Sequence, residues 1–348
     1  MTNNNLPTVS VIAPCRNEAD FIEEAIKSIL ANDYPPELLE VLVIDGMSTD
    51  GTREIVKKLS QEDNRIKLLD NPQKIVPSAM NIGIKASKSH YIVRIDCHCE
   101  FNSDYISKCI EILQRTNAEN VGGYMKTLSG DKSATAMAIS SASSSIFGVG
   151  NSAFRIGGVE CEADTVPFGT YRKELFDRIG LYDERLVRNQ DIELNSRIRK
   201  NGGKIVISPE IKLSYYNRST YTGIWQQSFN NGLWNPYTIW LVGGGLSIRH
   251  FIPMVFVLSL VFLTIGSWFF WPISILLAVD IILYSSVAAF FATRIAKENK
   301  VFGLRVFWAF IVLHIAYGIG SLWGIITIPF KFPNRKSSKK GTALADRK

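Results

Sequence analysis

The segment Tyr91-Ile92-Val93-Arg94-Ile95-Asp96-Cys97-His98-Cys99-Glu100 decides how the rest of the chain is interpreted. It starts as a short apolar strand and stops in a cluster of side chains that ligate metals. In a parallel α/β sheet, ligands bind just beyond the carboxyl ends of the strands. Asp96 and His98 stand at positions i and i+2, so around a tight strand end both can face one cation. A carboxylate and a neutral imidazole suit Mn²⁺ or Mg²⁺ that also carries a phosphate ligand.

Two other interpretations of this segment stay open on these residues alone. A strand followed by an ordinary polar turn explains them equally well, because loops are polar by default. The Cys97-His98-Cys99 run is also typical of zinc ligands. A second Cys or His pair at zinc-site spacing is missing from the sequence, however, and this disfavours zinc.

Apolar runs alternate with helical patterns on the N-terminal side of this segment. Such alternation favours right-handed βαβ units, and therefore a mostly parallel sheet with helices on both faces. Two of the strands end in acidic turns, which favours a nucleotide site. No Gly-x-Gly-x-x-Gly or Walker motif follows the first strand, so dinucleotide binding and ATP hydrolysis are disfavoured. The expected strands span 9–14, 39–44 and 66–69, and the expected helices span 19–30, 52–61 and 78–86.

Four sequence motifs occur in the first hundred residues: VIAPCRNE at 11–18, VIDGMSTDGT at 43–52, NIG at 81–83 and RIDCH at 94–98. Together they resemble the family 2 glycosyltransferases. This resemblance covers residues 7–235 and implies a GT-A fold and transfer of a sugar from a nucleotide-sugar with inversion. Within the family, the chain looks most like the membrane-bound branch that builds bacterial exopolysaccharides such as succinoglycan.

The resemblance also implies roles for single residues on the donor side. Gly46 departs from the family pattern, because a second Asp is usual there. Lys74, which precedes the helix of Asn81, is a candidate phosphate contact, and a solvated loop lysine is the alternative. The residues matched to nucleoside binding are Pro14, Glu18, Asp45 and Asp50.

The metal motif and the catalytic base of the family also have counterparts. The family's Asp-x-Asp motif matches Asp96 and His98, and an imidazole brings no negative charge, so we expect the cation to bind mainly with the diphosphate. A Glu-Asp pair of the family matches Gln190-Asp191. An inverting transfer needs one base to take the proton of the acceptor hydroxyl, and Asp191 is the candidate. Without the resemblance, an acidic residue in a first helical turn is more simply a partner of the helix dipole.

The stretch 129–155 is rich in Ser, Ala and Gly, so we expect no packed helix there but a linker, or a loop or helix pair near the acceptor. Processive relatives carry Gln-x-x-Arg-Trp where this chain has 226–235, and the Arg is absent, which disfavours processive synthesis. The same stretch is also typical of an amphipathic helix at a membrane interface.

Three apolar segments follow, at 251–271, 272–291 and 306–330, each long enough to cross a bilayer as a helix. Asp280 lies inside the second, and an intramembrane carboxylate is by default a functional or pairing site. Basic residues near membrane helices are in excess on the cytosolic side. If the catalytic domain is cytosolic, two crossings leave the basic loop 294–305 in the cytosol, which agrees with this rule, but a third crossing would place the basic tail outside, which does not. We therefore expect the third segment not to cross fully. The alternatives are that an additional short segment near 239–248 enters the bilayer, or that the tail breaks the positive-inside rule.

Charge is concentrated at the C-terminal end. Of the net charge of +7, the tail 331–348 carries +6 from seven basic residues and one acidic residue, which leaves +1 for the rest. This distribution argues against a nucleic-acid-binding face and for attraction of the tail to anionic lipid. The five cysteines, an odd number, suit reduced thiols better than a disulfide framework.

The expected organisation is a cytosolic GT-A domain at 1–235, interfacial and transmembrane helices at 236–330, and a basic tail at 331–348. We expect a multi-pass protein of a bacterial inner membrane, with a UDP-sugar donor, a divalent metal and a lipid-linked saccharide acceptor. The alternatives are a polyprenyl-phosphate glycosyltransferase, a processive polysaccharide synthase, or a non-catalytic membrane scaffold that binds nucleotide.

Overall fold

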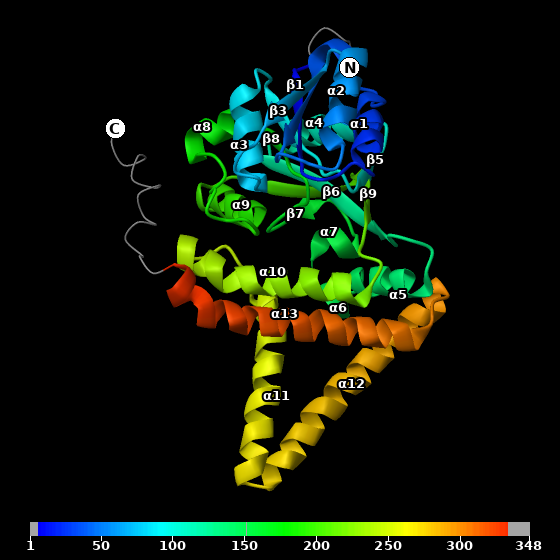
Figure 1. The fold of residues 1–348 in the computed structure, drawn as a ribbon, viewed down its shortest axis with the longest axis vertical. Helices are drawn as coiled ribbons and strands as arrows, with labels where there is room; N and C mark the ends of the chain where they lie inside the picture. The colour runs from blue at the N-terminus through cyan, green and yellow to red at the C-terminus, as the bar shows by residue number, and fades with distance from the viewer. Residues whose placement is uncertain (1–5, 151, 333–348) are drawn as a thin grey trace. The chain divides into compact units, whose positions relative to one another are not determined.

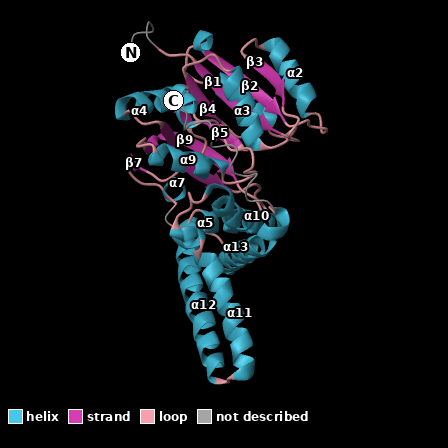
Figure 2. Ribbon diagram, turned by 90° about the vertical axis from the view of Figure 1, so that its left-hand side faces the viewer, coloured by secondary structure: helices cyan, strands magenta, loops and turns pink. Residues whose placement is uncertain are grey.

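The structure is a computed structural model that describes residues 6–150 and 152–332. The chain divides into two compact units, of which the first comprises Met1–Leu128 with Ser152–Tyr216 and the second comprises Ser129–Asn151 with Asn217–Lys348. Figure 2 shows that the described strands belong to the first unit, whereas the second is helical.

Four parallel strands form one half of the sheet in the first unit, in the order β3-β2-β1-β4. These strands and the three helices between them confirm the expected βαβ pattern to within a few residues at each end. Because the strands run the same way, their carboxyl ends share one edge. The elements are β1 Val9–Cys15, α1 Ile22–Leu30, β2 Leu39–Asp45, α2 Thr52–Glu62, β3 Ile66–Asp70, α3 Val76–Ala86 and β4 Tyr91–Arg94.

Helices cover both faces of this half-sheet, so its strands are apolar on both sides. Val9 and Val11 of β1 are fully buried in a core shared with α1, α2 and α4 (Tyr105–Thr116). Ile12 of the same strand points the other way, into a core shared with α3, α8 (Glu174–Ile179) and α9 (Gln190–Lys200). Alternation along one strand thus fixes which helices lie on which face.

The rest of the sheet is mixed, because β8 pairs antiparallel with β4 and β6, and β9 pairs antiparallel with β5 and β7. Strand β9 is continuous through Pro209. Its pairing with β6 shifts register between Gly123 and Tyr124, and a bulge absorbs the extra residues. The remaining strands are β5 Cys99–Phe101, β6 Asn120–Leu128, β7 Cys161–Glu162, β8 Thr170–Arg172 and β9 Ile205–Tyr216.

The stretch 129–155 contains a packed helix, so the expectation of a linker or loop is wrong there, whereas the alternative of a helix pair agrees with the structure. Helix α5 (Ala134–Ser143) buries Ala138, Ile139 and Ala142 completely, in a cluster with side chains of the C-terminal helices. Its small residues are a means of close packing here, not a sign of a flexible linker. Two short helices follow, α6 Ile146–Val149 in the second unit and α7 Ala153–Ile156 in the first.

Two long helices of the second unit, α10 (Tyr221–Val242) and α13 (Gly303–Lys331), lie side by side in Figure 1. Glycines let their backbones approach closely. A Cβ on Gly232 would lie 2.0 Å from the carbonyl oxygen of Tyr317, and a Cβ on Gly320 would lie 2.1 Å from that of Phe229. Larger side chains at these two glycines would therefore separate the helices.

Among the described residues, three helices are long and apolar enough to cross a membrane: α11 (Ile252–Phe269), α12 (Pro272–Asn299) and α13. In their most apolar windows, 6% of the residues of α11 and 11% of α12 are buried, against 50% of α13. Figure 1 shows α11 and α12 as a hairpin that leaves the α10–α13 pair. Within it, Ser259 donates a 2.7 Å hydrogen bond to Asp280. The tail from 333 to 348 lies outside the described residues.

Candidate active site

The turns after β1 and β2 are joined by hydrogen bonds at the carboxyl edge of the sheet. The backbone N–H of Glu18 donates to the hydroxyl of Thr52 (2.8 Å), and that of Ala19 donates to the carboxylate of Asp50 (3.1 Å). Hydrogen bonds from Thr52 also hold the pKa of Asp50 below its ordinary value. Two residues matched to the nucleoside, Glu18 and Asp50, are therefore brought together, and Pro14 lies half-buried just before them.

Asp45, a third residue matched to the nucleoside, is fully buried at the end of β2. Its carboxylate accepts a 3.0 Å hydrogen bond from the backbone of Ser48 and pairs with Arg53, whose other terminal nitrogen lies 2.7 Å from Asp70. Burial opposes ionisation, but the hydrogen bonds from Ser48 and Arg53 outweigh it and lower the pKa of Asp45. Arg53 was not expected at the site, and protein groups already engage the Asp45 carboxylate.

Backbone geometry describes two further residues near Asp45, namely Gly46 and Lys74. A Cβ on Gly46 would lie 3.1 Å from that of Arg16, so the arginine side chain covers the place where the family usually has Asp. Lys74 is exposed, with a φ of +61°, in the turn between β3 and α3. That turn also lies at the carboxyl edge of the sheet, because Asn71 donates from its backbone to the carbonyl of Asp45 (2.8 Å).

Asp96 and His98 lie together, as the spacing predicts. The backbone N–H of His98 donates to Asp96 Oδ1 (3.0 Å), and His98 Nδ1 lies 3.4 Å from the same oxygen. Burial disfavours the charged form of Asp96, but these contacts prevail and lower its pKa. The other ring nitrogen of His98 lies 3.4 Å from Glu18 Oε2, and Phe21 packs on the ring with centroids 4.6 Å apart. Glu18, matched only to the nucleoside by sequence, thus joins the metal motif.

These side chains fit a divalent cation that shares its coordination with substrate oxygens. In residues 6–150 and 152–332, no three His, Cys, Asp or Glu side chains are arranged to hold a metal by themselves. Mg²⁺ is usually bound by one or two protein ligands together with substrate phosphates, and Mn²⁺ takes similar ligands, so the neighbouring Asp96 and His98 are candidates for such a pair. Zinc fits poorly, because a zinc site needs three or four protein ligands and the described residues hold no such group around Cys97 and Cys99.

Asp191, matched to the catalytic base, stands half-buried in the first turn of α9. The helix begins after Asn189, which has a φ of +61°. Asp191 Oδ1 accepts a hydrogen bond from the backbone of Ile192 (2.9 Å).

Arg94 is a cation near the site that the sequence argument did not assign. It is 9% exposed, and its Nε has no hydrogen-bond partner among the described residues. Burial opposes its charge, but attraction to Tyr182, Asp191, Tyr171 and Asp96 is stronger, so the pKa of Arg94 is raised. One cation inside an otherwise apolar strand was the signal that could have identified it.

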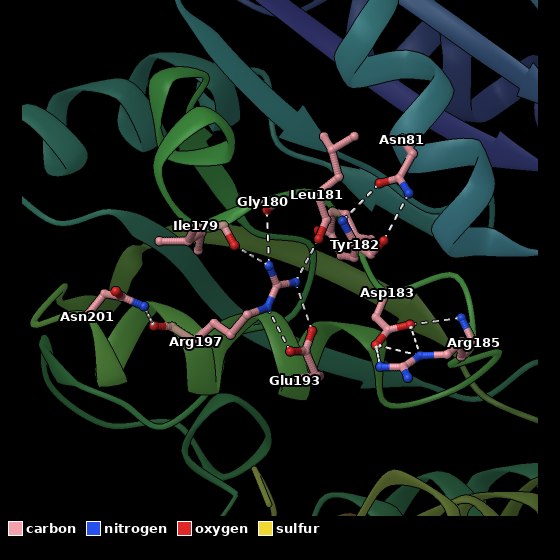
Figure 3. Close-up of polar contacts among 10 residues, drawn as sticks. All are labelled: Asn81, Ile179, Gly180, Leu181, Tyr182, Asp183, Arg185, Glu193, Arg197 and Asn201. Carbon is pink, nitrogen blue, oxygen red and sulfur yellow. Dashed lines mark hydrogen bonds and ion pairs between the residues drawn. The ribbon is translucent and has the colours of Figure 1, made fainter. Parts of the chain in front are cut away.

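Two further side chains that the sequence did not assign a role hold the segment that leads into α9, and Figure 3 shows them. Arg197 of α9 hydrogen-bonds three consecutive backbone carbonyls, those of Ile179, Gly180 and Leu181. Asn81 of α3 bonds both backbone polar groups of Tyr182. The NIG motif at 81–83 was the signal for Asn81, although it gave no role.

Comparison with known proteins decides the family. A profile described as "Glycosyl transferase family 2" matches residues 10–179. The succinoglycan biosynthesis protein ExoA of Rhizobium meliloti is 35% identical over 238 residues, which cover 67% of this chain and 71% of ExoA. The chain belongs to glycosyltransferase family 2.

Two further proteins are similar to this family 2 glycosyltransferase. A dolichyl N-acetyl-alpha-D-glucosaminyl phosphate 3-beta-D-2,3-diacetamido-2,3-dideoxy-beta-D-glucuronosyltransferase of Methanococcus voltae is 30% identical over 64% of this chain and 71% of its own length. The mannosyltransferase PcManGT of Pyrobaculum calidifontis, solved with GDP-Man and Mn²⁺, superposes with a TM-score of 0.58 at 16% identity, over 92% of this chain and 88% of its own. The expected GT-A fold is thereby confirmed, and the chain is a glycosyltransferase.

Proposed function

We propose that the protein is a membrane-anchored, metal-dependent, inverting glycosyltransferase that moves a sugar from a nucleotide-sugar to a lipid-linked saccharide. The observation that carries this proposal is the meeting of the Glu18–Asp50 turns with the Asp96–His98 pair at one edge of the sheet. A nucleoside and a metal-bound diphosphate need such neighbouring groups. The complex of PcManGT with GDP-Man and Mn²⁺ supports the same ligand classes.

Each side chain of the site has one role in this proposal. Glu18, Asp50 and the buried Asp45, with Pro14, form the nucleoside side, and Lys74 contacts phosphate. Asp191 takes the proton of the acceptor hydroxyl as its oxygen attacks the anomeric carbon. Asp96 and His98 would hold a divalent cation, and that cation would neutralise the charge of the departing diphosphate.

The acceptor and the membrane arrangement are also part of the proposal. The names of the ExoA and Methanococcus voltae relatives support an acceptor in saccharide assembly, and the second name supports a lipid phosphate. Helices α11 and α12 cross a bacterial inner membrane, while α10 and the half-buried α13 stay at its cytosolic face. This arrangement keeps the basic residues after α12 in the cytosol. The cytosolic domain comprises 1–235, although α10 continues through its boundary, and 331–348 is a basic tail.

Radiolabelled transfer by the purified protein in detergent tests this function. A panel of UDP-sugars, with GDP-mannose as the alternative donor, is offered with Mn²⁺ or Mg²⁺ and a polyprenyl-linked saccharide. We expect metal-dependent UDP release and one added sugar for each acceptor. A ladder of products would favour a processive synthase. Transfer to polyprenyl phosphate that carries no saccharide would favour a polyprenyl-phosphate glycosyltransferase. Nucleotide binding without turnover of any donor would contradict the proposal.

A further inference from the structure

Helix α8 ends at Gly180, whose φ of +82° favours glycine. Three successive carbonyl oxygens accept hydrogen bonds from the guanidinium of Arg197, at 2.6 Å for Ile179, 3.1 Å for Gly180 and 2.8 Å for Leu181 (Figure 3). The same guanidinium donates to both oxygens of Glu193, at 2.7 and 2.8 Å. Arginine has five N–H donors, and these five hydrogen bonds occupy all of them.

The next residues of this segment are fixed to α3 instead. The Asn81 side chain, 4% exposed, accepts from the backbone N–H of Tyr182 and donates to its carbonyl, both at 2.9 Å (Figure 3). It also donates to Glu184 Oε1 at 2.8 Å. Because these groups are largely shielded from water, a replacement that cannot make the same bonds leaves polar atoms unsatisfied.

Glu184 extends the connection to the donor side of the site. Its second oxygen accepts a 3.0 Å hydrogen bond from Gln73, the neighbour of the proposed phosphate contact Lys74. One carboxylate therefore joins the turn before α3, the body of α3, and the segment before α9. Beside it, Arg185 donates to its neighbour Asp183 from the backbone (3.0 Å) and from the side chain (2.8 Å) (Figure 3).

We propose that Asn81, Glu184 and Arg197 are positioning residues that hold the segment 179–185 between α3 and α9, and so set where Asp191 stands relative to the donor. The proposal rests on the proposed function, in which Asp191 is the base. None of the three touches substrate. They act by fixing both the chain that enters α9 and the first two turns of that helix. A shift of about 1 Å in a catalytic group can cost about a hundredfold in rate.

Arg197→Lys tests the α9 end of the connection. Lysine keeps the charge opposite Glu193 but has only three donors, so it cannot hold all three carbonyls and the carboxylate. We expect kcat to fall about tenfold or more, while the KM for the donor and the affinity for UDP, measured by calorimetry, change less than about twofold. The matched control is Arg199→Lys on the exposed face of the same helix.

The double variant Asn81→Asp with Glu184→Gln tests the α3 end of the connection. It exchanges the amide and the carboxylate that form the hydrogen bond between these two side chains. In the single variant Asn81→Asp, the introduced carboxylate faces that of Glu184 and has no N–H to donate. We therefore expect kcat to fall about as much as in Arg197→Lys, by about tenfold or more. In the double variant the glutamine amide can donate to the introduced carboxylate and still accept from Gln73. We expect the double variant to be at least about fivefold more active than Asn81→Asp, with UDP affinity again unchanged.

Three results would overturn the proposal: wild-type kcat in Arg197→Lys, a parallel fall of kcat and UDP affinity, or no rescue in a folded double variant. Thermal melting shows whether each variant is folded. If Asn81→Asp does not fold, the result for Arg197→Lys decides alone. Failure of the proposed function is separate, because it shows as a wild-type protein that releases no UDP, or as an Asp191→Asn protein with full activity.

Discussion

The donor side and the base side of the site are built in different ways. On the donor side, the turns after β1, β2 and β4 lie together because parallel strands end at one edge, and short backbone-to-side-chain bonds join them. On the proposed base side, Asp191 follows a segment that Asn81 of α3 and Arg197 of α9 hold by hydrogen bonds. The sheet topology thus brings the donor-side turns together, whereas we propose that individual hydrogen bonds position Asp191. Substitutions should separate the two sides cleanly.

The largest effect is expected from Asp191→Asn. Loss of a general base typically costs about 10²- to 10⁴-fold in rate, and we expect a fall in kcat of this size, with UDP affinity unchanged. Steady-state kinetics and calorimetry on the same preparation check the prediction. The control is Asp177→Asn, an exposed carboxylate on α8. A similar loss in both variants would mean that Asp191 has no special role.

On the donor side, Arg53→Met should affect stability more than turnover. The change leaves the fully buried Asp45 carboxylate without its cation. Breaking a buried pair costs about 3–5 kcal/mol, and because Arg53 is itself 21% exposed we expect roughly 2–3 kcal/mol. Urea denaturation measures the change, with Lys57→Met on the exposed face of α2 as the control. Equal stability of the two variants would contradict the account.

His98 offers a test of the metal motif. His98→Ala should raise the Mn²⁺ concentration needed for half-maximal activity by about tenfold or more, because second-shell changes alone cost about 10- to 100-fold in metal affinity. His98→Asp, which restores the residue that is usual in the family, should lower it below the wild-type value. Metal titrations of UDP release make the measurement. An unchanged metal requirement in both variants would exclude His98 as a ligand.

The smallest expected effect is on how the stability of the folded chain depends on pH. The pKa of Asp45 is lower in the folded chain than its ordinary value of 3.8. A lowered folded pKa gives stability that is complete above the unfolded pKa and is lost as pH falls through the folded value. The stability difference between wild type and Arg53→Met should therefore be constant from about pH 5 to 7 and narrow below about pH 4. Denaturation curves across this range check the prediction, and a difference that widens on acidification would contradict it.

The two sides also differ in how far the sequence predicts them. The strands and turns of the donor side follow from local patterns, and the contact of Asp96 with His98 follows from their i, i+2 spacing. Helical spacing predicts the i,i+4 pair of Arg197 with Glu193. The bonds of Arg197 to the carbonyls of 179–181 and the pair of Arg53 with Asp45 were missed, because these partners lie outside the arginine's own helix and periodicity gives no information on them. The antiparallel half of the sheet was missed for a similar reason, since an apolar run predicts a strand but not its direction. Helix α5 was missed because its small residues are equally typical of a linker.

The configuration of the sugar released or transferred from a UDP-α-sugar tests the central claim most directly. If Asp191 activates the attacking oxygen for a single displacement, the first product is the β-anomer. Proton NMR follows this in real time, before mutarotation, even when water replaces the acceptor. We predict an initial β-product in wild type and almost none in Asp191→Asn. An initial α-product would mean retention of configuration, and would contradict both the inverting reaction and the role of Asp191.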